Sequence, residues 1–411
     1  MRRSDDVRLH RFPCRDGRPF AFTESACPHP IRCGRAMIRE LWAEWVAGFR
    51  ALAFDRFPYR RFATALLLGL VGGWVFVLLK LPLPWMLGPM TICTLAAIVS
   101  APVAAPPVIR PPMTVVIGVL LGASFTPELI RQAPLWLPSV AGLVVFMAAC
   151  AVLCVTFFRR VGGFDRTTAY FAGMPGGLVE MVTVGEEKGG DARMIALVHS
   201  ARILLVVLSL PFVVQWIEGV PLGGRRTAGM SLLDTPLASD LWLIACGLAG
   251  ILLGQILRLP AKYLLGPMLA TAIVHVTGIS DFHPPAEIVI VAQLVLGVTI
   301  GCRFVGTPSR LILRVLALSV GSTIILLGLT VLFAWLVSRF SGYGMVPLML
   351  AYSPGGLAEM SLVALALKIE VAFVAAQHII RIFLVMVLAG PLFGLFTRGE
   401  PPATGTGDDG P

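Results

Sequence analysis

From residue 62 onward the chain is a succession of long apolar runs, separated by short stretches that contain charges, prolines or glycines. A helix that crosses a bilayer needs about 20 apolar residues, within a range of about 17–25. Most of the runs reach that length, so the pattern predicts an all-α polytopic membrane protein. The runs are 62–79, 84–100, 112–127, 132–158, 167–179, 194–217, 241–257, 263–280, 288–302, 315–338, 340–358 and 371–397.

The composition supports this class and excludes several others. Of the 411 residues, 57% are hydrophobic and 14% are charged, whereas soluble domains have about 45–50% apolar and about 25% charged residues. The mean hydropathy of +0.84 agrees with this. A soluble enzyme, a disordered protein and a disulfide scaffold are excluded, and the lipid bilayer is the expected surroundings of the chain.

Four sequence motifs occur twice, and the distance along the chain between the two copies is nearly the same for all four. This regularity predicts two homologous membrane units, 62–217 and 238–397, joined by a linker at 218–237. The paired motifs are LKLPLPWMLGPM at 79–90 with LRLPAKYLLGPM at 257–268, GVLLGASF at 118–125 with GVTIGCRF at 297–304, MPGGLVEM at 174–181 with SPGGLAEM at 353–360, and HSAR at 199–202 with HIIR at 378–381.

The distribution of Lys and Arg favours inverted repeats. With twelve crossings, and with Arg202 and Arg381 left out because they lie within helices, the basic residues from Arg60 onward divide equally, 10 to 10, which lacks the excess expected on the cytoplasmic side. If each Pro-Gly-Gly segment enters the membrane and returns, ten crossings remain and the division becomes 14 to 6. We therefore expect two inverted five-span units in a bacterial inner membrane, with both termini cytoplasmic, although Arg225 and Arg226 then lie outside. The fourteen are Arg60, Arg61, Arg110, Arg159, Arg160, Arg166, Lys188, Arg193, Arg258, Lys262, Arg303, Arg310, Arg314 and Arg398.

The two ends of the chain differ from this membrane part. Residues 1–61 form a basic leader with 13 Arg against 7 acidic residues. Residues 37–53 have the pattern of a helix that lies at the membrane surface, and residues 1–36 are expected to be a flexible tail or to precede a real start at Met37. The leader has no recognisable nucleic-acid-binding module, so no direct nucleic-acid partner is expected. Residues 398–411 are expected to be a disordered tail.

The duplicated Pro-Gly-Gly segments are the first candidate for a functional site. Pro removes a backbone donor and Gly weakens a helix, so each segment is expected to break its helix. Broken helices at matching places in two repeats are typical of transporter binding sites, with a kink or a close helix crossing as the alternative. The residues of the two breaks are Pro175, Gly176, Gly177, Pro354, Gly355 and Gly356.

A carboxylate follows each break. Glu180 and Glu359 each lie three residues after the second Gly, in the first turns of a new half-helix, where the partial positive charge of a helix N-terminus suits an anion. Carboxylates inside a membrane usually mark an ion or proton pathway. The alternative is a Glu that caps a helix near the surface.

Two His–Arg pairs are the second candidate. His199 and Arg202 lie three residues apart and share one helix face, as do His378 and Arg381. A buried Arg needs a counter-charge, which one of the two carboxylates is expected to supply; alternatively the guanidinium receives an anionic substrate. The His side chains suit coupling to pH. A structural His–Arg–Glu lock between helices remains as the further interpretation.

Together these motifs resemble the AbrB family of membrane proteins over about residues 62–397. The motifs that carry the resemblance are LP-x(4)-LGPM, PGGL-x-EM and a downstream H-x-x-R, each present twice. Members are labelled ammonia monooxygenases or regulators of gene expression, and they differ from the small soluble DNA-binding regulator of the same name. A monooxygenase needs a redox metal or an organic cofactor. The sequence offers no convincing ligand set, so neither a cofactor nor a metal site is expected.

The sequence therefore predicts a secondary transporter of a small metabolite or ion, with its site between the two units, rather than an enzyme. The alternative is a membrane sensor that uses the same site and affects gene expression indirectly, through a protein partner. The identity of the substrate and the existence of an oligomer are left open.

Overall fold

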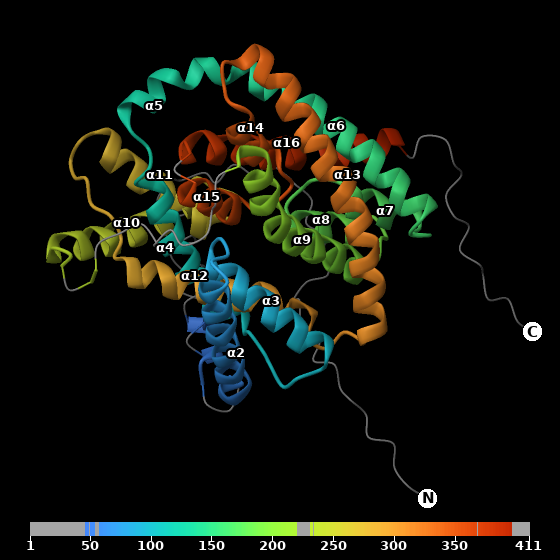
Figure 1. Ribbon diagram of the computed structural model, residues 1–411, viewed down its shortest axis with the longest axis horizontal. Helices are drawn as coiled ribbons and strands as arrows, with labels where there is room; N and C mark the ends of the chain where they lie inside the picture. Colours follow the sequence, from blue (N-terminus) through green and yellow to red (C-terminus); the bar gives the residue numbers. More distant parts are fainter. Residues whose placement is uncertain are drawn as a thin grey trace, which may run out of the picture. The chain divides into compact units, whose positions relative to one another are not determined.

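The computed structural model describes residues 46–48, 50–53, 57–219, 231–232, 234–367 and 369–396. These residues are mainly helical and contain no β-strand (Figure 1). The elements are α2 (Tyr59–Leu78), α3 (Pro84–Ile98), η1 (Pro107–Ile109), α4 (Arg110–Gly122), α5 (Pro127–Gln132), η2 (Ala133–Trp136), α6 (Leu137–Arg160), α7 (Arg166–Gly173), α8 (Leu178–Glu187), α9 (Ala192–Glu218), α10 (Leu237–Ile256), α11 (Lys262–Val276), α12 (Ala286–Gly301), η3 (Cys302–Phe304), α13 (Ser309–Ser341), α14 (Met345–Tyr352), α15 (Leu357–Ala366) and α16 (Val371–Phe396).

The predictions for the two ends of the chain fall mainly outside the described residues. This applies to the tail at 1–36, to most of the surface helix expected at 37–53, to most of the linker at 218–237 and to the tail at 398–411. Within the surface helix, residues 46–48, 50 and 51 are described and are helical.

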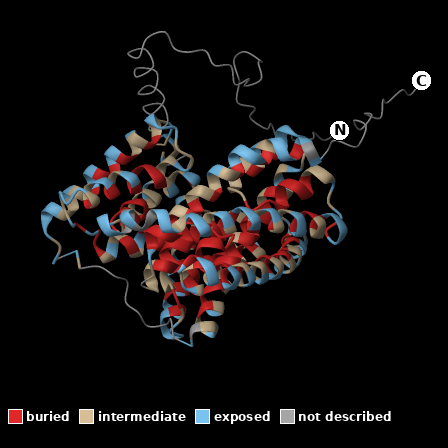
Figure 2. Ribbon diagram, turned by 90° about the horizontal axis from the view of Figure 1, so that it is seen from above, coloured by how far each residue is buried: buried red, intermediate tan, exposed pale blue. Residues whose placement is uncertain are grey.

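Seven of the described helices are long and apolar enough to cross a membrane, judged by length and composition. They are α2, α6 with η2, α9, α10, α12 with η3, α13 and α16. Shorter apolar helices, including α3, α4 and α11, lie between them. The coarse class that the sequence predicts is thereby confirmed for the described residues: they form an all-helical protein with several helices that can span a membrane. Buried residues gather in the interior of the helical body, and many exposed positions of its outer helices are apolar, as a lipid-facing surface requires (Figure 2).

Glycines allow helices from the two predicted units to cross in close contact. On α4, Gly118 and Gly122 face the carbonyl oxygens of Leu264 and Met268 on α11, and a Cβ at either glycine would overlap that oxygen. On α12, Gly297 and Gly301 face Met86 and Met90 of α3 in the same way. The glycines of each pair lie four residues apart, which is the small-xxx-small spacing typical of close helix packing.

Helices α6 and α13 lie side by side and run in opposite directions (Figure 1). A Cβ at Gly142 near the start of α6 would lie 2.7 Å from Val337 near the end of α13. At the far end, a Cβ at Gly321 would lie 2.6 Å from the Phe157 ring. Between them, the Phe146 and Phe333 rings are 5.6 Å apart. In the predicted repeat α13 corresponds to α6, and these two helices pack antiparallel.

The short helices α7 and α8 form one hairpin and α14 and α15 form another, and the end of each hairpin lies beside its start. At the start of α7, the Thr168 hydroxyl accepts a hydrogen bond from the backbone N–H of Asp191, just before α9. Asp191 itself caps α9 by accepting from the N–H of Met194 at 3.0 Å. In the second hairpin, Tyr343 before α14 stacks on Phe373 at the start of α16, with ring centroids 4.3 Å apart. Each hairpin thus begins and ends at the same end of the helical body.

Candidate functional site

The backbone leaves the helical conformation at both predicted breaks. α7 ends at Gly173 and Met174 is extended, with ψ of 136°, before α8 begins after Gly177. α14 ends at Tyr352 and Ser353 is likewise extended, with ψ of 135°. The break residues from Met174 to Pro175 and from Ser353 to Gly355 are buried. Carbonyl groups at the ends of α7 and α14 therefore need donors inside the protein, since water does not reach them.

α9 supplies these donors for the first break. His199 Nε2 lies 2.8 Å from the carbonyl oxygen of Phe171, and Arg202 Nη1 donates to that of Met174 at 2.9 Å. Arg202 Nη2 lies 2.7 Å from His199 Nδ1 and 3.4 Å from the Gly176 carbonyl oxygen. Because a guanidinium can only donate, His199 Nδ1 accepts, and Nε2 carries the hydrogen that is given to Phe171. His199 is neutral in this arrangement.

α16 supplies the donors for the second break with matching geometry. His378 Nε2 lies 3.0 Å from the Leu350 carbonyl oxygen. Arg381 Nη1 donates to Ser353 at 2.6 Å and Nη2 to Gly355 at 2.8 Å. Each of these acceptors occupies the same place in the repeat as its counterpart in the first break. Two details differ among the described residues: His378 Nδ1 is buried without a hydrogen-bond partner, and so is Arg202 Nε in the first unit.

The expected ion pairs between these arginines and the carboxylates are not formed. Within the described part of the chain, neither Arg202 nor Arg381 forms a direct ion pair or hydrogen bond with Glu180 or Glu359; both use Nη1 and Nη2 on backbone carbonyl oxygens. The physical reason is that the last carbonyls of α7 and α14 carry the negative end of a helix dipole and are buried. A guanidinium with its several donors satisfies two such carbonyls at once.

The two carboxylates lie at the N-termini of the second half-helices, as predicted. Glu180 is in the first turn of α8 and Glu359 in the first turn of α15, each three residues after an N-cap glycine. Each side chain folds back over that glycine, so that a Cβ at Gly177 or Gly356 would overlap the Glu Oε2 atom. A side chain at either glycine would therefore have to displace the carboxylate from this position. Glu359 is 7% exposed, whereas Glu180 is only partly buried.

The two breaks lie near each other in the protein. Arg202 and Arg381 interact electrostatically, and both also interact with Cys150 of α6. A Cβ at Gly176 would lie 2.7 Å from Val385 of α16, which belongs to the second unit. The His–Arg pairs and the broken backbone of both units therefore form one cluster, in the region of α7, α8, α14 and α15 (Figure 1).

The sequence interpretation overlooked Arg303 as a site residue and assigned it to a cytoplasmic connection. Arg303 is in η3, directly after α12, and interacts electrostatically with both Glu359 and His199. Its Nη1 atom is buried and, among the described residues, has no hydrogen-bond partner. The available signal was a departure from the repeat, because the equivalent position in the first unit is Ser124. A basic residue present in only one copy of a duplicated motif is not explained by the packing that the two copies share.

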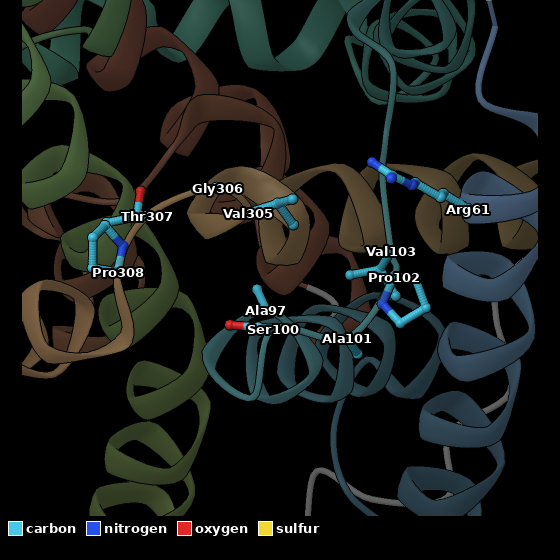
Figure 3. Close-up of a pocket in the computed structure, with 10 residues that line it drawn as sticks. All are labelled: Arg61, Ala97, Ser100, Ala101, Pro102, Val103, Val305, Gly306, Thr307 and Pro308. Atoms are coloured by element: carbon cyan, nitrogen blue, oxygen red, sulfur yellow. The ribbon is translucent and has the colours of Figure 1, made fainter. Parts of the chain in front are cut away.

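A surface pocket of about 540 Å³ lies apart from the breaks, where α3 ends and α13 begins (Figure 3). Arg61 projects towards it from α2, and none of the predicted site residues lines it. Ser309 closes the neighbouring turn by donating to the Ile98 carbonyl oxygen at 2.7 Å. The remaining residues that line the pocket are Ala97, Ser100, Ala101, Pro102, Val103, Val305, Gly306, Thr307 and Pro308.

In the described part of the chain, no three His, Cys, Asp or Glu residues are grouped as a metal ion would require.

A family model described as "Transition state regulatory protein AbrB" matches residues 85–397, well over half of the chain. The chain belongs to the AbrB family. It is 29% identical over 345 residues to "Uncharacterized protein YhjN" of Bacillus subtilis (strain 168), covering 79% of this chain and 90% of that protein. It is 23% identical over 329 residues to "Putative regulator AbrB" of Escherichia coli (strain K12), covering 80% and 93%. Neither name is that of an enzyme. The AbrB match includes both breaks, both carboxylates and both His–Arg pairs, so the site lies inside the part that defines the family.

Proposed function

We propose that the protein is a secondary transporter of a small metabolite in a bacterial inner membrane, with its site at the two breaks. The observation that carries this proposal is the clustering of two buried helix breaks, each with a carboxylate at the N-terminus of a half-helix. Discontinuous helices near the middle of the membrane, at the interface of two repeats, are where many secondary transporters hold substrate and coupling ion.

An inverted architecture with ten crossings is the second part of the proposal. Equivalent helices α6 and α13 pack antiparallel, which supports a two-fold axis in the membrane plane. Both hairpins return to the end at which they start, so that α3, α4 and α11 join the seven longer helices as crossings. The two hairpins follow the opposite ends of the α6–α13 pair. They would therefore enter the membrane from opposite sides.

In the proposed mechanism the carboxylates and the His–Arg pairs have different tasks. Arg202 and Arg381 hold the broken backbone in shape through its carbonyl groups. Glu180 and Glu359, which take no part in those bonds, bind the coupling ion or proton next to the half-helix N-termini. Movement of one unit against the other would then open the site to each side in turn.

The test is metabolite profiling, inside cells and in the medium, of a deletion strain carrying wild type or a variant. We expect one class of small molecule to change its partition in the deletion strain and to be restored by wild type. Glu359→Gln and the double variant with Glu180→Gln should fail to restore it at normal protein level. Glu187→Gln is the matched control, because Glu187 is an exposed residue at the other end of α8. Full rescue by the double variant would refute the proposed mechanism.

A membrane sensor is the second candidate, favoured by the regulator name of the Escherichia coli relative. It would use the same site without moving the ligand and would act through a protein partner. A changed transcript profile without any change in metabolite partition would support it. A chain that starts at Met37 tests the leader as the docking segment: rescue at normal protein level would remove residues 1–36 from that role.

A further inference from the structure

The interior of the site carries more positive than negative charge. Among the described residues, the charged side chains classed as buried, apart from histidines, are Arg202, Arg381 and Glu359. The two arginines spend their donors on neutral carbonyl groups, which satisfy hydrogen bonds but leave the charge uncompensated. A buried charge without an opposite charge is costly. The net positive charge of these buried side chains would be compensated by a bound anion that is not part of the chain.

Arg303 adds to this imbalance at a position that faces Glu359. Its side chain is partly buried as a whole, but Nη1 is completely buried and, within the described part of the chain, unpartnered. It interacts electrostatically with Glu359 without forming a direct ion pair. Arg202 Nε is a second buried donor without a partner. A buried charged donor that makes no hydrogen bond lowers the stability of the folded protein. The unpartnered Nη1 of Arg303 and Nε of Arg202 therefore indicate that the site lacks an acceptor.

We propose that the site binds a small anion with a carboxylate or another oxyanion, which accepts a hydrogen bond from Arg303 Nη1. A guanidinium suits this task because its planar fork matches two oxygen atoms and forms short charge-assisted bonds. Since Ser124 replaces Arg303 in the first unit, the anion binds on one side of the pseudo-symmetric site. This inference rests on the proposed function only where it concerns transport of the bound anion.

The structural alternative is that Arg303 merely stabilises the C-terminal end of α12 through its positive charge. In that case Lys at this position would serve nearly as well, and no added anion would affect Arg303 more than any other basic residue. The two interpretations therefore differ in a ligand-dependent measurement as well as in stability.

The experiment measures thermal unfolding of the purified full-length protein in detergent, with acetate, lactate, succinate, phosphate or sulfate titrated against sodium chloride of equal ionic strength. We expect at least one of these anions to raise the Tm of the wild-type protein in a saturable manner. Arg303→Gln should abolish that rise, and Arg303→Lys should weaken the apparent affinity about tenfold because the bidentate fork is lost. Arg310→Gln, which removes an exposed charge seven residues later, is the matched control and should behave as wild type.

The outcomes separate this inference from the proposed function. If no anion raises the wild-type Tm, or if Arg303→Gln responds like wild type, the anion site is refuted. If Arg303→Gln does not yield folded protein, the comparison of Arg303→Lys with Arg310→Gln decides in its place. If metabolite profiling instead identifies a neutral or cationic substrate, transport stands and the anion class is wrong. Saturable anion binding without any change in metabolite partition keeps the site and overturns transport.

Discussion

Replacing Arg381 is expected to destabilise the second break, because Arg381 holds it with two charged hydrogen bonds. Arg381 is 5% exposed, and its Nη1 and Nη2 atoms donate to the carbonyl oxygens of Ser353 and Gly355 at 2.6 and 2.8 Å. Arg381→Gln removes the charge and the two guanidinium donors that serve these acceptors. Two carbonyl groups at a buried break are then left without donors, where no water replaces the guanidinium.

The magnitude follows from the two orphaned acceptors. A buried acceptor left unpaired costs about 1–3 kcal/mol, so two acceptors predict a loss of about 2–6 kcal/mol in the free energy of unfolding. At about 2 °C per kcal/mol, the low end of the range for domains of 150–250 residues, this lowers the apparent Tm by about 4–12 °C. Arg381→Lys keeps the charge but offers one compact ammonium group, so roughly half of the loss is expected.

The assay is thermal unfolding of the purified variants in one detergent, together with their level in the membrane. Arg314→Gln is the control, because it removes an exposed charge from α13. If Arg381→Gln unfolds within about 1 °C of wild type, the carbonyl bonds do not hold the break. Arg381 would then be free to receive a substrate directly, and the division of tasks between arginines and carboxylates would have to be abandoned.

Three further predictions test the helix packing and the topology. Gly118→Ala should reduce the amount of folded protein, because its Cβ would lie 2.5 Å from the Leu264 carbonyl oxygen. Gly328→Ala is the control and should be tolerated, because no atom lies within 4 Å of the new Cβ. Equal yields of the two variants by size-exclusion chromatography would refute the close crossing of α4 and α11. In a variant that keeps only Cys93 and Cys302, which are buried and lie near each other where α3 packs on η3, a mild thiol oxidant should form a disulfide detectable by mass spectrometry of peptides. Its absence would place α3 and η3 further apart. In intact cells, a membrane-impermeant maleimide should label Arg339→Cys but not Arg160→Cys, since antiparallel α6 and α13 put their last turns at opposite faces; equal labelling would contradict the inverted arrangement.

Much of the fold is predictable from the sequence because a membrane restricts the chain to helices whose length matches the bilayer. The apolar runs correspond to the described helices, and the breaks at Pro175 and Pro354 occur where the missing donor of proline demands them. The repeated motifs also make matching contacts in the structure. The carbonyl oxygens of Phe171 and Leu350, which occupy equivalent places in the two units, bind equivalent histidines. Where two copies of a motif agree, their shared residue types encode shared geometry.

The site was less predictable, because partner choice depends on distances that no spacing encodes. A buried arginine indicates a need for acceptors, but the sequence does not tell a carboxylate from a carbonyl group at a broken helix. The expectation of ion pairs with Glu180 and Glu359 was wrong for that reason. Arg303 was overlooked because its electrostatic interaction with Glu359 joins η3 to α15, and these elements are far apart in the chain.

The differences between the two units are the more informative part of the duplication. A perfectly symmetric pair would offer two equivalent sites and no reason for one ligand to choose between them. Here the equivalent positions diverge in a consistent direction: Glu359 is buried where Glu180 is partly exposed, His378 Nδ1 lacks the partner that His199 Nδ1 has, and Arg303 replaces Ser124. The shared bonds give the two breaks the same local geometry. Among the described residues of the site, one unsatisfied arginine donor, Arg303 Nη1, and the buried carboxylate of Glu359 lie in the second unit, whereas the other unsatisfied arginine donor, Arg202 Nε, lies in the first. In the proposed transporter the two units would move against each other, while Arg303 and the buried Glu359 of the second unit would hold the anion and the coupling ion.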